Sequence, residues 1–466
     1  MISSINEFEN VFFIGVAGTG MSALAQYLSG TGKVVSGSDR YFKENEFNDT
    51  KDKLERSGIH CFIQDGEGIT EHTQLIVVST AIEDTVPEVQ KAKSLSIPII
   101  KRSELLALIA KSKKSIAVAG TSGKSTTSAM LFNIMEKAGM FPSIISGAGL
   151  VNIIKEGKIG NAKVGSGEWL IIEADESDGS IVEYTPEVGL LLNIDKDHQE
   201  MEELMNIFTL FKHNTKELFI VNQSNVFAKA LSQDISHDFS CDPTSLAGYV
   251  ASDFNQEGLN ITFSAQSTSE KSGRTQFSIA TIGKHNMENA LAAIAVANQL
   301  GVDMQTCADG LKNYEGIHRR HQLLGIKNGI YVIDDYAHNP VKCAASIAAC
   351  QQIAPKVVAW FQPHGYGPTR FLKDDFIKEI AGALRSVDEI WMSEIFYAGG
   401  TAEKNISSND LILEIKNMGH KAFFVEERDG FLERVRPHLT NDCVLLLMGA
   451  RDPGLEAFSK SVWEKL

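Results

Sequence analysis

One short stretch, Ala119-Gly-Thr-Ser-Gly-Lys-Ser-Thr126, constrains the fold more than any other part of the sequence. An apolar run at 115–119 leads into it and a helical pattern follows, so we expect a strand, a glycine loop and a helix in succession. Glycines let the backbone fold around phosphate oxygens, and the free amides at the start of a helix donate to them. The residues expected to hold a nucleotide phosphate are Gly120, Thr121, Gly123, Lys124, Ser125 and Thr126.

Two side chains of this loop have chemically distinct expected roles. Lys124 would reach the β- and γ-phosphates of ATP, and the Ser125 hydroxyl would bind Mg²⁺. The spacing departs from the usual phosphate loop, because Gly120 lies three residues before Gly123 rather than five. The alternative is a tight strand–helix turn with a lysine in solvent.

A second glycine-rich turn follows the apolar run at 11–16, with glycines at Gly15, Gly18 and Gly20. A helical pattern over 21–28 and a strand pattern over 33–39 complete a nucleotide-binding βαβ unit. The glycine spacing differs from G-x-G-x-x-G. The sequence therefore leaves three alternatives open here: a dinucleotide site, a UDP-type pyrophosphate site and a packing turn.

Carboxylates follow two further apolar strand patterns, at 170–178 and 190–198. The carboxyl ends of strands in an α/β sheet converge on the ligand crevice. Glu173 and His198 could therefore complete a magnesium site with Ser125, although magnesium prefers oxygen ligands to histidine. The alternative is that these groups are solvated caps at strand ends.

The remaining sequence predicts several α/β domains, because 466 residues are too many for one hydrophobic core. We expect strands near 75–79, 97–100, 330–333, 357–361 and 444–448, and a helix over 287–300. That alternation of strands and helices indicates layered α/β structure. The polar run 264–275 is expected to be an exposed hairpin or loop.

Charge and composition exclude some classes of function. The net charge of −15 argues against a nucleic-acid partner. No run of about 18 apolar residues predicts a membrane span, and the first residues do not predict a secretory signal. The six cysteines form no C-x-x-C pair, which favours a reducing cytoplasm without disulfides or a zinc site.

Taken in order, these motifs resemble the Mur ligase family of cell-wall synthesis over nearly the whole chain. The resemblance rests also on Gly283-Lys-His-Asn-Met-Glu-Asn-Ala290, Asp334-Asp-Tyr-Ala-His338 and Phe361-Gln-Pro-His364. It implies an α/β fold of three domains: a Rossmann-like UDP-sugar domain (1–112), a central P-loop ATPase domain (113–316) and a C-terminal Rossmann-like domain (317–466). The last would bind the incoming amine and close over ATP.

The resemblance also implies a set of site residues. The expected contacts to the UDP-sugar are Gly15, Gly18, Gly20, Ser38, Asp39 and Ser79. Those expected to bind ATP beyond the phosphate loop are Asn286, Asn289, Arg320 and Asp335. Glu173 and His198 would join Ser125 as magnesium ligands. Further substrate contacts would be Tyr336, His338, His364 and Tyr366, and the catalytic residues would be Lys124, Glu173, His198 and Arg320.

The activity implied is an ATP-dependent amide ligation in peptidoglycan precursor synthesis. UDP-N-acetylmuramate would be joined, through an acyl phosphate, to L-alanine or a related amine by a monomer or weak homodimer. The alanine-adding members usually read FQPHRYSRT where this chain has Phe361-Gln-Pro-His-Gly-Tyr-Gly-Pro-Thr369. Gly365 and Pro368 thus replace two arginines, the natural partners of an amino-acid carboxylate. A ligase that recovers a tripeptide, or a paralogue with another carboxylate and amine, is the alternative.

Three other classes remain as rivals. A P-loop kinase or simple ATPase would share Lys124 and Ser125 but would need no amine. An NAD-dependent oxidoreductase rests only on the first glycine turn. A non-catalytic UDP-sugar-binding module would have no use for the magnesium and phosphate residues.

Overall fold

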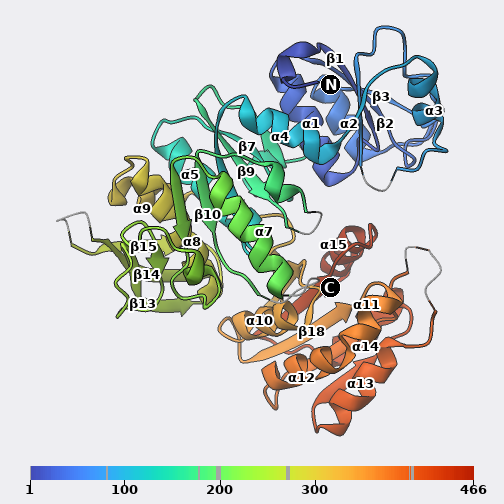
Figure 1. Ribbon diagram of the computed structural model, residues 1–466. Coiled ribbons are helices and arrows are strands. Elements are labelled where there is room, and N and C mark those ends of the chain that lie inside the picture. Colours follow the sequence, from blue (N-terminus) through green and yellow to red (C-terminus); the bar gives the residue numbers. More distant parts are fainter. Residues whose placement is uncertain are drawn as a thin grey trace. The chain divides into compact units, whose positions relative to one another are not determined.

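The computed structural model describes residues 2–79, 82–176, 179–195, 201–268, 273–397, 399 and 403–466. These residues form two compact units. The first consists of Met1–Asp253, Phe263–Ile279 and Asn286–Ile317, and the second of Phe254–Thr262, Ala280–His285 and His318–Leu466. Figure 1 shows the elements of each unit, coloured along the chain.

The N-terminal sheet is parallel throughout, with the strand order β3-β2-β1-β4-β5. Its strands are β1 (Asn10–Ile14), β2 (Val34–Ser38), β3 (His60–Phe62), β4 (Leu75–Val78) and β5 (Ile99–Lys101). The helical segments of this part are η1 (Ile5–Glu7), α1 (Thr19–Gly30), α2 (Asp49–Arg56), α3 (Pro87–Ser94) and α4 (Arg102–Lys111). The order reverses between β1 and β4, which places the first glycine turn at the switch point of an open α/β sheet.

The central sheet has the order β11-β10-β6-β9-β7-β8, parallel except for its edge strand β8. Its strands are β6 (Lys114–Ala119), β7 (Ser143–Ile145), β8 (Ala162–Lys163), β9 (Trp169–Ala174), β10 (Val188–Leu191) and β11 (Leu218–Val221). The helical segments that follow its strands are α5 (Lys124–Lys137), α6 (Val151–Ile154), η2 (Ser180–Glu183), α7 (Met201–Asn214) and η3 (Ala228–Leu231). The phosphate-loop strand β6 lies between β10 and β9, so the acidic strand ends flank the loop.

A small sheet with the order β12-β13-β14-β15 follows. Its strands are β12 (Phe239–Ser240), β13 (Tyr249–Glu257), β14 (Asn260–Ser267) and β15 (Thr275–Ile279), and α8 (Lys284–Gln299) and α9 (Met304–Lys312) come next. The run 264–275, expected to be an exposed hairpin or loop, links the neighbouring strands β14 and β15, and the expected exposure is wrong for Ser264 and Ser267. Ser264 and Ser267 are both buried although they lie on opposite faces of this strand: Ser267 shares the face of Phe263 and Ala265, and the Ser264 hydroxyl accepts from Gln276 Nε2 at 2.7 Å.

The C-terminal sheet has the order β16-β17-β21-β18-β19-β20, and only β16 is antiparallel to its neighbour. Its strands are β16 (Gln322–Lys327), β17 (Ile330–Asp335), β18 (Lys356–Gln362), β19 (Glu389–Met392), β20 (Lys421–Phe424) and β21 (Cys443–Gly449). The helical segments are α10 (Pro340–Cys350), α11 (Tyr366–Phe371), α12 (Lys373–Ala383), α13 (Ser408–Asn417), η4 (Arg428–Gly430), α14 (Phe431–Val435), η5 (Arg436–His438) and α15 (Leu455–Lys465).

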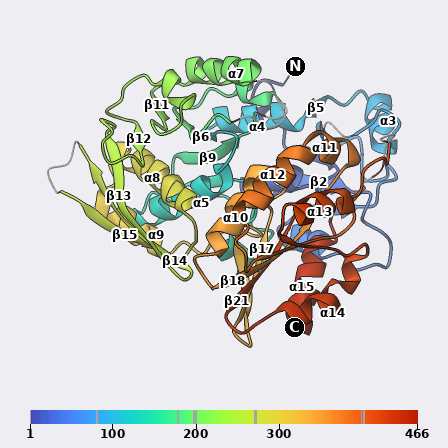
Figure 2. The ribbon, with the colours of Figure 1, turned by 90° about the horizontal axis from the view of Figure 1, so that it is seen from below.

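Both faces of this C-terminal sheet are buried. Alternate residues of β21 enter two separate cores, Val444 and Leu446 on one face and Leu445 and Leu447 on the other. The first core is closed by α10, α12 and α13 and the second by α14 and α15, and Figure 2 shows the two groups on either side of the sheet. Near-continuous apolar strands of this kind are typical of parallel sheets covered by helices on both sides.

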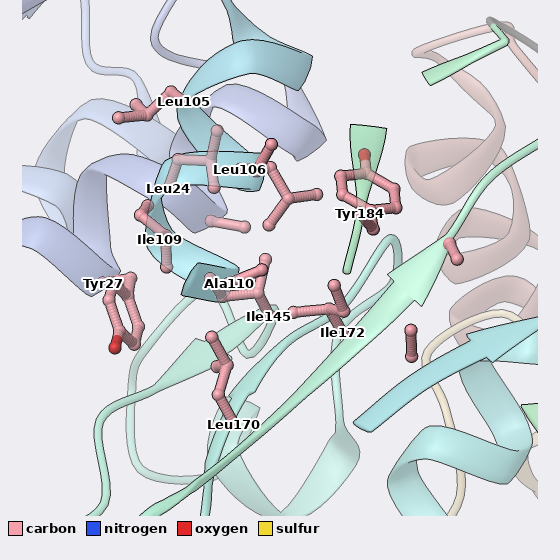
Figure 3. Close-up of a cluster of buried hydrophobic side chains, with 14 of the residues drawn as sticks. Leu24, Tyr27, Leu105, Leu106, Ile109, Ala110, Ile145, Leu170, Ile172 and Tyr184 are labelled. Carbon is pink, nitrogen blue, oxygen red and sulfur yellow. The ribbon is translucent and has the colours of Figure 1, made fainter. Parts of the chain in front are cut away.

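A large hydrophobic core joins the two large sheets of the first unit, and a smaller cluster around Phe12 and Ile76 lies in its N-terminal part. Figure 3 shows side chains of α1 and α4, among them Leu24 and Ile109, packed with Leu170 and Ile172 of β9. Asn161, which is fully buried, adds a polar link to this core. Its Nδ2 donates to the Thr19 carbonyl oxygen at 2.8 Å and to the Ser22 hydroxyl at 3.0 Å, and its Oδ1 accepts from Gln26 at 2.7 Å.

The six cysteines are all free in this structure, as the scattered pattern predicts. None of the helices in the described parts of the chain is both long enough and apolar enough to cross a bilayer.

Candidate active site

The phosphate loop joins β6 to α5, as the sequence predicts, and its backbone requires glycine at two positions. Gly123 caps α5 with a φ of 85°, and a Cβ there would lie 2.4 Å from Asn289 Oδ1. Gly120 has a φ of 137° and lies against the backbone of Asn193. Any side chain at either position would therefore strain the loop. No side chain caps the first turn of α5, so its amides remain available to an anion.

Lys124 begins α5 and is largely buried. Its Nζ donates to the Gly120 carbonyl oxygen at 2.7 Å and to Glu176 Oε2 at 2.6 Å, and lies 3.6 Å from Asp175 Oδ1. Burial alone would lower the pKa of Lys124, but the carboxylates of Glu176, Asp175 and Glu173 outweigh it and raise the pKa. The lysine is therefore a fixed positive charge inside the loop, and the sequence reasoning did not identify Glu176 as its partner.

A group of oxygen atoms surrounds the carboxylate of Glu173 at the end of β9. Its Oε2 accepts from the Ser125 hydroxyl at 2.9 Å, and its Oε1 accepts from the Ser146 hydroxyl at 2.6 Å and from the Gly147 amide at 2.8 Å. Hard oxygen donors of this kind are the ligands that Mg²⁺ prefers, so Ser125 and Glu173 fit a magnesium ion.

The third expected metal ligand, His198, lies outside the described residues. Within the described ranges, no group of three or more His, Cys, Asp or Glu side chains is arranged to hold a metal ion. Of the three expected metal ligands the structure therefore describes two, Ser125 and Glu173, and their hydroxyl and carboxylate oxygens are of the kind that magnesium binds.

Asn193, just beyond β10, holds the phosphate loop from the opposite side. Its Oδ1 accepts from the Thr121 hydroxyl and from the Ser122 amide, both at 2.9 Å, and its Nδ2 donates to the Ser122 carbonyl oxygen at 3.2 Å. The Thr121 hydroxyl in turn accepts from the Asp195 amide at 3.1 Å. In this structure the Thr121 hydroxyl therefore makes its hydrogen bonds to other residues of the protein. Asn193 could have been identified from the sequence by its place just after a buried strand.

Two asparagines of α8 reach the same part of the first unit. Asn289 Oδ1 lies 3.4 Å from the Thr127 hydroxyl, and Asn289 Nδ2 donates to Asn286 Oδ1 at 3.0 Å. Both side chains are buried. The structure therefore brings these two expected ATP contacts to the helix that starts at Lys124.

The first glycine turn lies between β1 and α1. Gly15 has a φ of 82°, and its amide donates to the Ser38 carbonyl oxygen at 2.8 Å. Asp39 Oδ2 accepts from the Ala17 amide at 3.0 Å, so the carboxylate fixes the turn. Gly18 caps α1 without a side-chain hydrogen bond, which leaves the amides of that helix available to an anion.

Ser38 supplies a direct indication of a ligand at this turn. Its hydroxyl is fully buried and has no hydrogen-bond partner among the described residues. Ser79 follows the neighbouring strand β4 at the same edge of the sheet. A buried hydroxyl without a partner costs free energy, which a polar group of a bound ligand would recover.

The C-terminal domain has its own cluster, which follows β17. Asp335 accepts a hydrogen bond from the His321 amide at 3.1 Å, and burial, which would raise its pKa, is outweighed by His321 and Arg320, so the pKa is lowered. The Arg320 guanidinium lies 5.0 Å from the centre of the Tyr336 ring. The adjacent Arg319 has a structural role, because it forms an ion pair with Asp334 at 3.0 Å and donates to the Gly449 carbonyl oxygen.

Aromatic side chains continue from this cluster along the carboxyl edge of the sheet. The Tyr336 ring lies 5.6 Å from the His338 ring, which lies 5.7 Å from the His364 ring. Burial lowers the pKa of His338 to about 4, with a further contribution from Lys342. His338 is therefore neutral at physiological pH. Tyr366 begins α11, two residues farther along the chain.

Comparison with known proteins assigns the family. The chain matches three family models in order: "Mur ligase family, catalytic domain" over residues 10–114, "Mur ligase middle domain" over 118–297, and "Mur ligase, glutamate ligase domain" over 319–451. A UDP-N-acetylmuramate–L-alanine ligase from Carboxydothermus hydrogenoformans is 34% identical over 450 residues, which cover 94% of this chain and 93% of the relative. One from Rickettsia felis is 33% identical, covering 95% and 94%.

Solved structures agree on the fold. The chain superimposes on a UDP-N-acetylmuramate–alanine ligase from Thermotoga maritima with a TM-score of 0.79, at 24% identity and 98% coverage of both chains. A murein peptide ligase from Psychrobacter arcticus gives a TM-score of 0.67 at 20% identity, again covering 98% of both. The three ordered domain matches and the full-length relatives show that the chain belongs to the Mur ligase family, with its three-domain α/β architecture.

Proposed function

We propose that this member of the Mur ligase family joins UDP-N-acetylmuramate to L-alanine, forming an amide at the expense of ATP in peptidoglycan precursor synthesis. Full-length relatives with that activity in their names support the assignment. The observation that carries it is the phosphate loop with its two fixed groups, Lys124 and the Ser125–Glu173 pair. We place the domain boundaries at 112/113 and 316/317.

The reaction follows from what these groups can do. The sugar carboxylate takes the γ-phosphoryl group of ATP, and ADP is released; the amine then attacks the acyl carbon, phosphate leaves, and the nitrogen loses a proton as the amide forms. Phosphoryl transfer needs positioning and charge neutralisation rather than a covalent protein group. Lys124 supplies one positive charge in the loop and Arg320 supplies another from the C-terminal domain.

Magnesium binding is assigned to Ser125 and Glu173, with His198 as the third ligand. A magnesium ion bound there would neutralise charge on the phosphate oxygens. Ser146 and the Gly147 amide hold Glu173 in place for that role. Lys124 contacts Glu176 in this structure, so an entering phosphate competes with that carboxylate for the ammonium.

The UDP-sugar is assigned to the first glycine turn. Gly15, Gly18 and Gly20 let the backbone approach a pyrophosphate, and Ser38, Asp39 and Ser79 surround the turn. The nucleotide substrates and the six free cysteines support a cytoplasmic location. The C-terminal residues Tyr336, His338, His364 and Tyr366 are assigned to the amine-binding side.

One observation favours a second candidate. Gly365 and Pro368 stand where alanine-adding members have arginines, so the amine could be a recovered tripeptide instead of free L-alanine. The test is release of ADP by the purified protein with ATP, Mg²⁺ and UDP-N-acetylmuramate, across L-alanine, glycine, L-serine and L-Ala-γ-D-Glu-diaminopimelate. Release that requires L-alanine supports the first assignment. Release only with the tripeptide supports the second, and release without any amine overturns both.

A further inference from the structure

The loop after β18 cannot carry an arginine at position 365 without strain. Gly365 has a φ of 73°, and a Cβ at that position would lie 3.3 Å from Pro368 Cδ. Backbone of this kind favours glycine, and the proline ring packs directly against it. The two replacements are therefore coupled: together they shape a loop that has no guanidinium at either position.

A different cation lies beside this loop. Lys404 Nζ is 4.8 Å from the centre of the Tyr397 ring and 5.9 Å from the centre of the Tyr366 ring, and the two rings meet edge to face at 5.4 Å. Among the described residues, Lys404 has no carboxylate within ion-pair distance. Tyrosine faces hold an ammonium without neutralising it, so its positive charge remains available to an anion.

Hydrogen bonds tie the loop to the segment that contains these side chains. The Gly365 amide donates to the Phe396 carbonyl oxygen at 2.8 Å, and the Phe396 amide donates to the Pro363 carbonyl oxygen at 2.8 Å. Arg370 Nη1 donates to Asn405 Oδ1 at 2.6 Å. The residues that follow β18 and β19 are thus one structure at the carboxyl edge of a parallel sheet, where ligands of α/β proteins bind.

The same edge continues without interruption toward the residues assigned to ATP. Ring contacts run from Tyr336 through His338 to His364, which directly precedes Gly365. Arg320 lies over the other end of this row, at Tyr336. An acceptor bound at the His364 end of this row lies beside the loop whose Tyr366 ring is next to Lys404.

We propose that Lys404, held over Tyr366 and Tyr397, binds the carboxylate of the incoming amine substrate in place of the arginines missing at positions 365 and 368. This inference rests on the proposed function, because it requires an amino acid or peptide as the acceptor. An ammonium is a point charge, whereas a guanidinium binds a carboxylate in a bidentate, planar geometry. Lys404 therefore favours a substrate with a negative charge but does little to fix the orientation of the carboxylate.

The test compares L-alanine with L-alaninamide, which has the amine but no carboxylate charge. In wild type, kcat/KM for L-alanine should exceed that for L-alaninamide. Lys404→Ala should lower kcat/KM for L-alanine about 10- to 100-fold, the usual effect of losing one charged hydrogen bond, and leave L-alaninamide unchanged. The KM values for ATP and UDP-N-acetylmuramate should not change. Lys404→Arg should retain most of the discrimination.

Two variants serve as controls. Lys416→Ala removes the same charge from an exposed position on α13 and should leave both amines unaffected. Arg370→Ala tests the other cation near the loop. Equal loss for both amines in Lys404→Ala, no loss for either, or loss of discrimination in Arg370→Ala instead would overturn the proposal. If wild type uses neither these amines nor the tripeptide, the proposed function itself fails, which is a separate outcome.

Discussion

The buried pair of Lys124 and Glu176 gives a prediction about stability that is independent of catalysis. Their side chains are only 15% and 9% exposed, with 2.6 Å between Nζ and Oε2. Lys124→Met leaves the Glu176 carboxylate buried without its counterion, which costs about 3–5 kcal/mol. Glu176→Gln is milder, about 1–2 kcal/mol, because Lys124 still donates to the Gly120 carbonyl oxygen and lies 3.6 Å from Asp175.

The double variant Lys124→Met/Glu176→Gln removes both charges together, so it should cost no more than about 1–2 kcal/mol. The two changes are then non-additive by about 2–6 kcal/mol, well above the few tenths expected of independent sites. Urea unfolding followed by tryptophan fluorescence, without nucleotide, measures each free energy. Additive costs would refute the claim that each group is needed mainly to neutralise the other.

A matched exposed pair provides the control. Lys155 and Glu315 lie 2.9 Å apart in the same unit, but their side chains are 65% and 42% exposed. The corresponding variants of that pair should change stability by less than about 1 kcal/mol, because solvent screens exposed charges. In activity assays, Lys124→Met should abolish turnover and leave UDP-sugar binding unchanged.

Three further predictions concern the metal site, pH and the domain link. Glu173→Gln should lower magnesium-dependent turnover by about 10²-fold or more, measured as ADP release, without changing UDP-sugar affinity. Burial and the nearby Lys342 lower the pKa of His338 to about 4, so folding keeps it neutral; stability present above pH 6.5 should be lost as pH falls toward 4, by no more than about 3 kcal/mol, and His338→Gln should flatten that dependence in urea titrations. Asn161→Ala removes three hydrogen bonds from a buried link between α1 and the central sheet. The variant should lower the free energy of unfolding by about 2–3 kcal/mol. An unchanged free energy of unfolding would show that the link is not stabilising.

Much of this fold could be predicted because its signals are local. Apolar runs ending in glycines or carboxylates identify β1, β6 and β9, and the phosphate loop follows its strand as expected. The expected helix over 287–300 is α8, which begins a few residues earlier at Lys284. The expected exposure was wrong at Ser264 and Ser267 because polarity alone suggested an exposed hairpin or loop, whereas both serines lie in β14, which has buried residues on both faces.

The unpredicted features are contacts between residues far apart in the sequence. Lys124 and Glu176 are 52 residues apart, and Gln26 and Asn161 are 135 apart. No local pattern indicates which distant side chain completes such a pair. Asn193 was within a recognised motif, but its hydrogen bonds to the phosphate loop depend on the order of strands β10 and β6, which only the folded sheet reveals.

Activation of the sugar carboxylate by ATP is tested most directly by following a carboxylate oxygen into the released phosphate. UDP-N-acetylmuramate labelled with ¹⁸O in its carboxylate is incubated with the protein, ATP, Mg²⁺ and L-alanine, and the products are analysed by mass spectrometry. Carboxylate activation by ATP should give the alanyl amide of the sugar nucleotide, ADP, and inorganic phosphate carrying one ¹⁸O from the carboxylate. Unlabelled phosphate, AMP in place of ADP, or ATP cleavage without amide would contradict activation of the carboxylate at the phosphate loop.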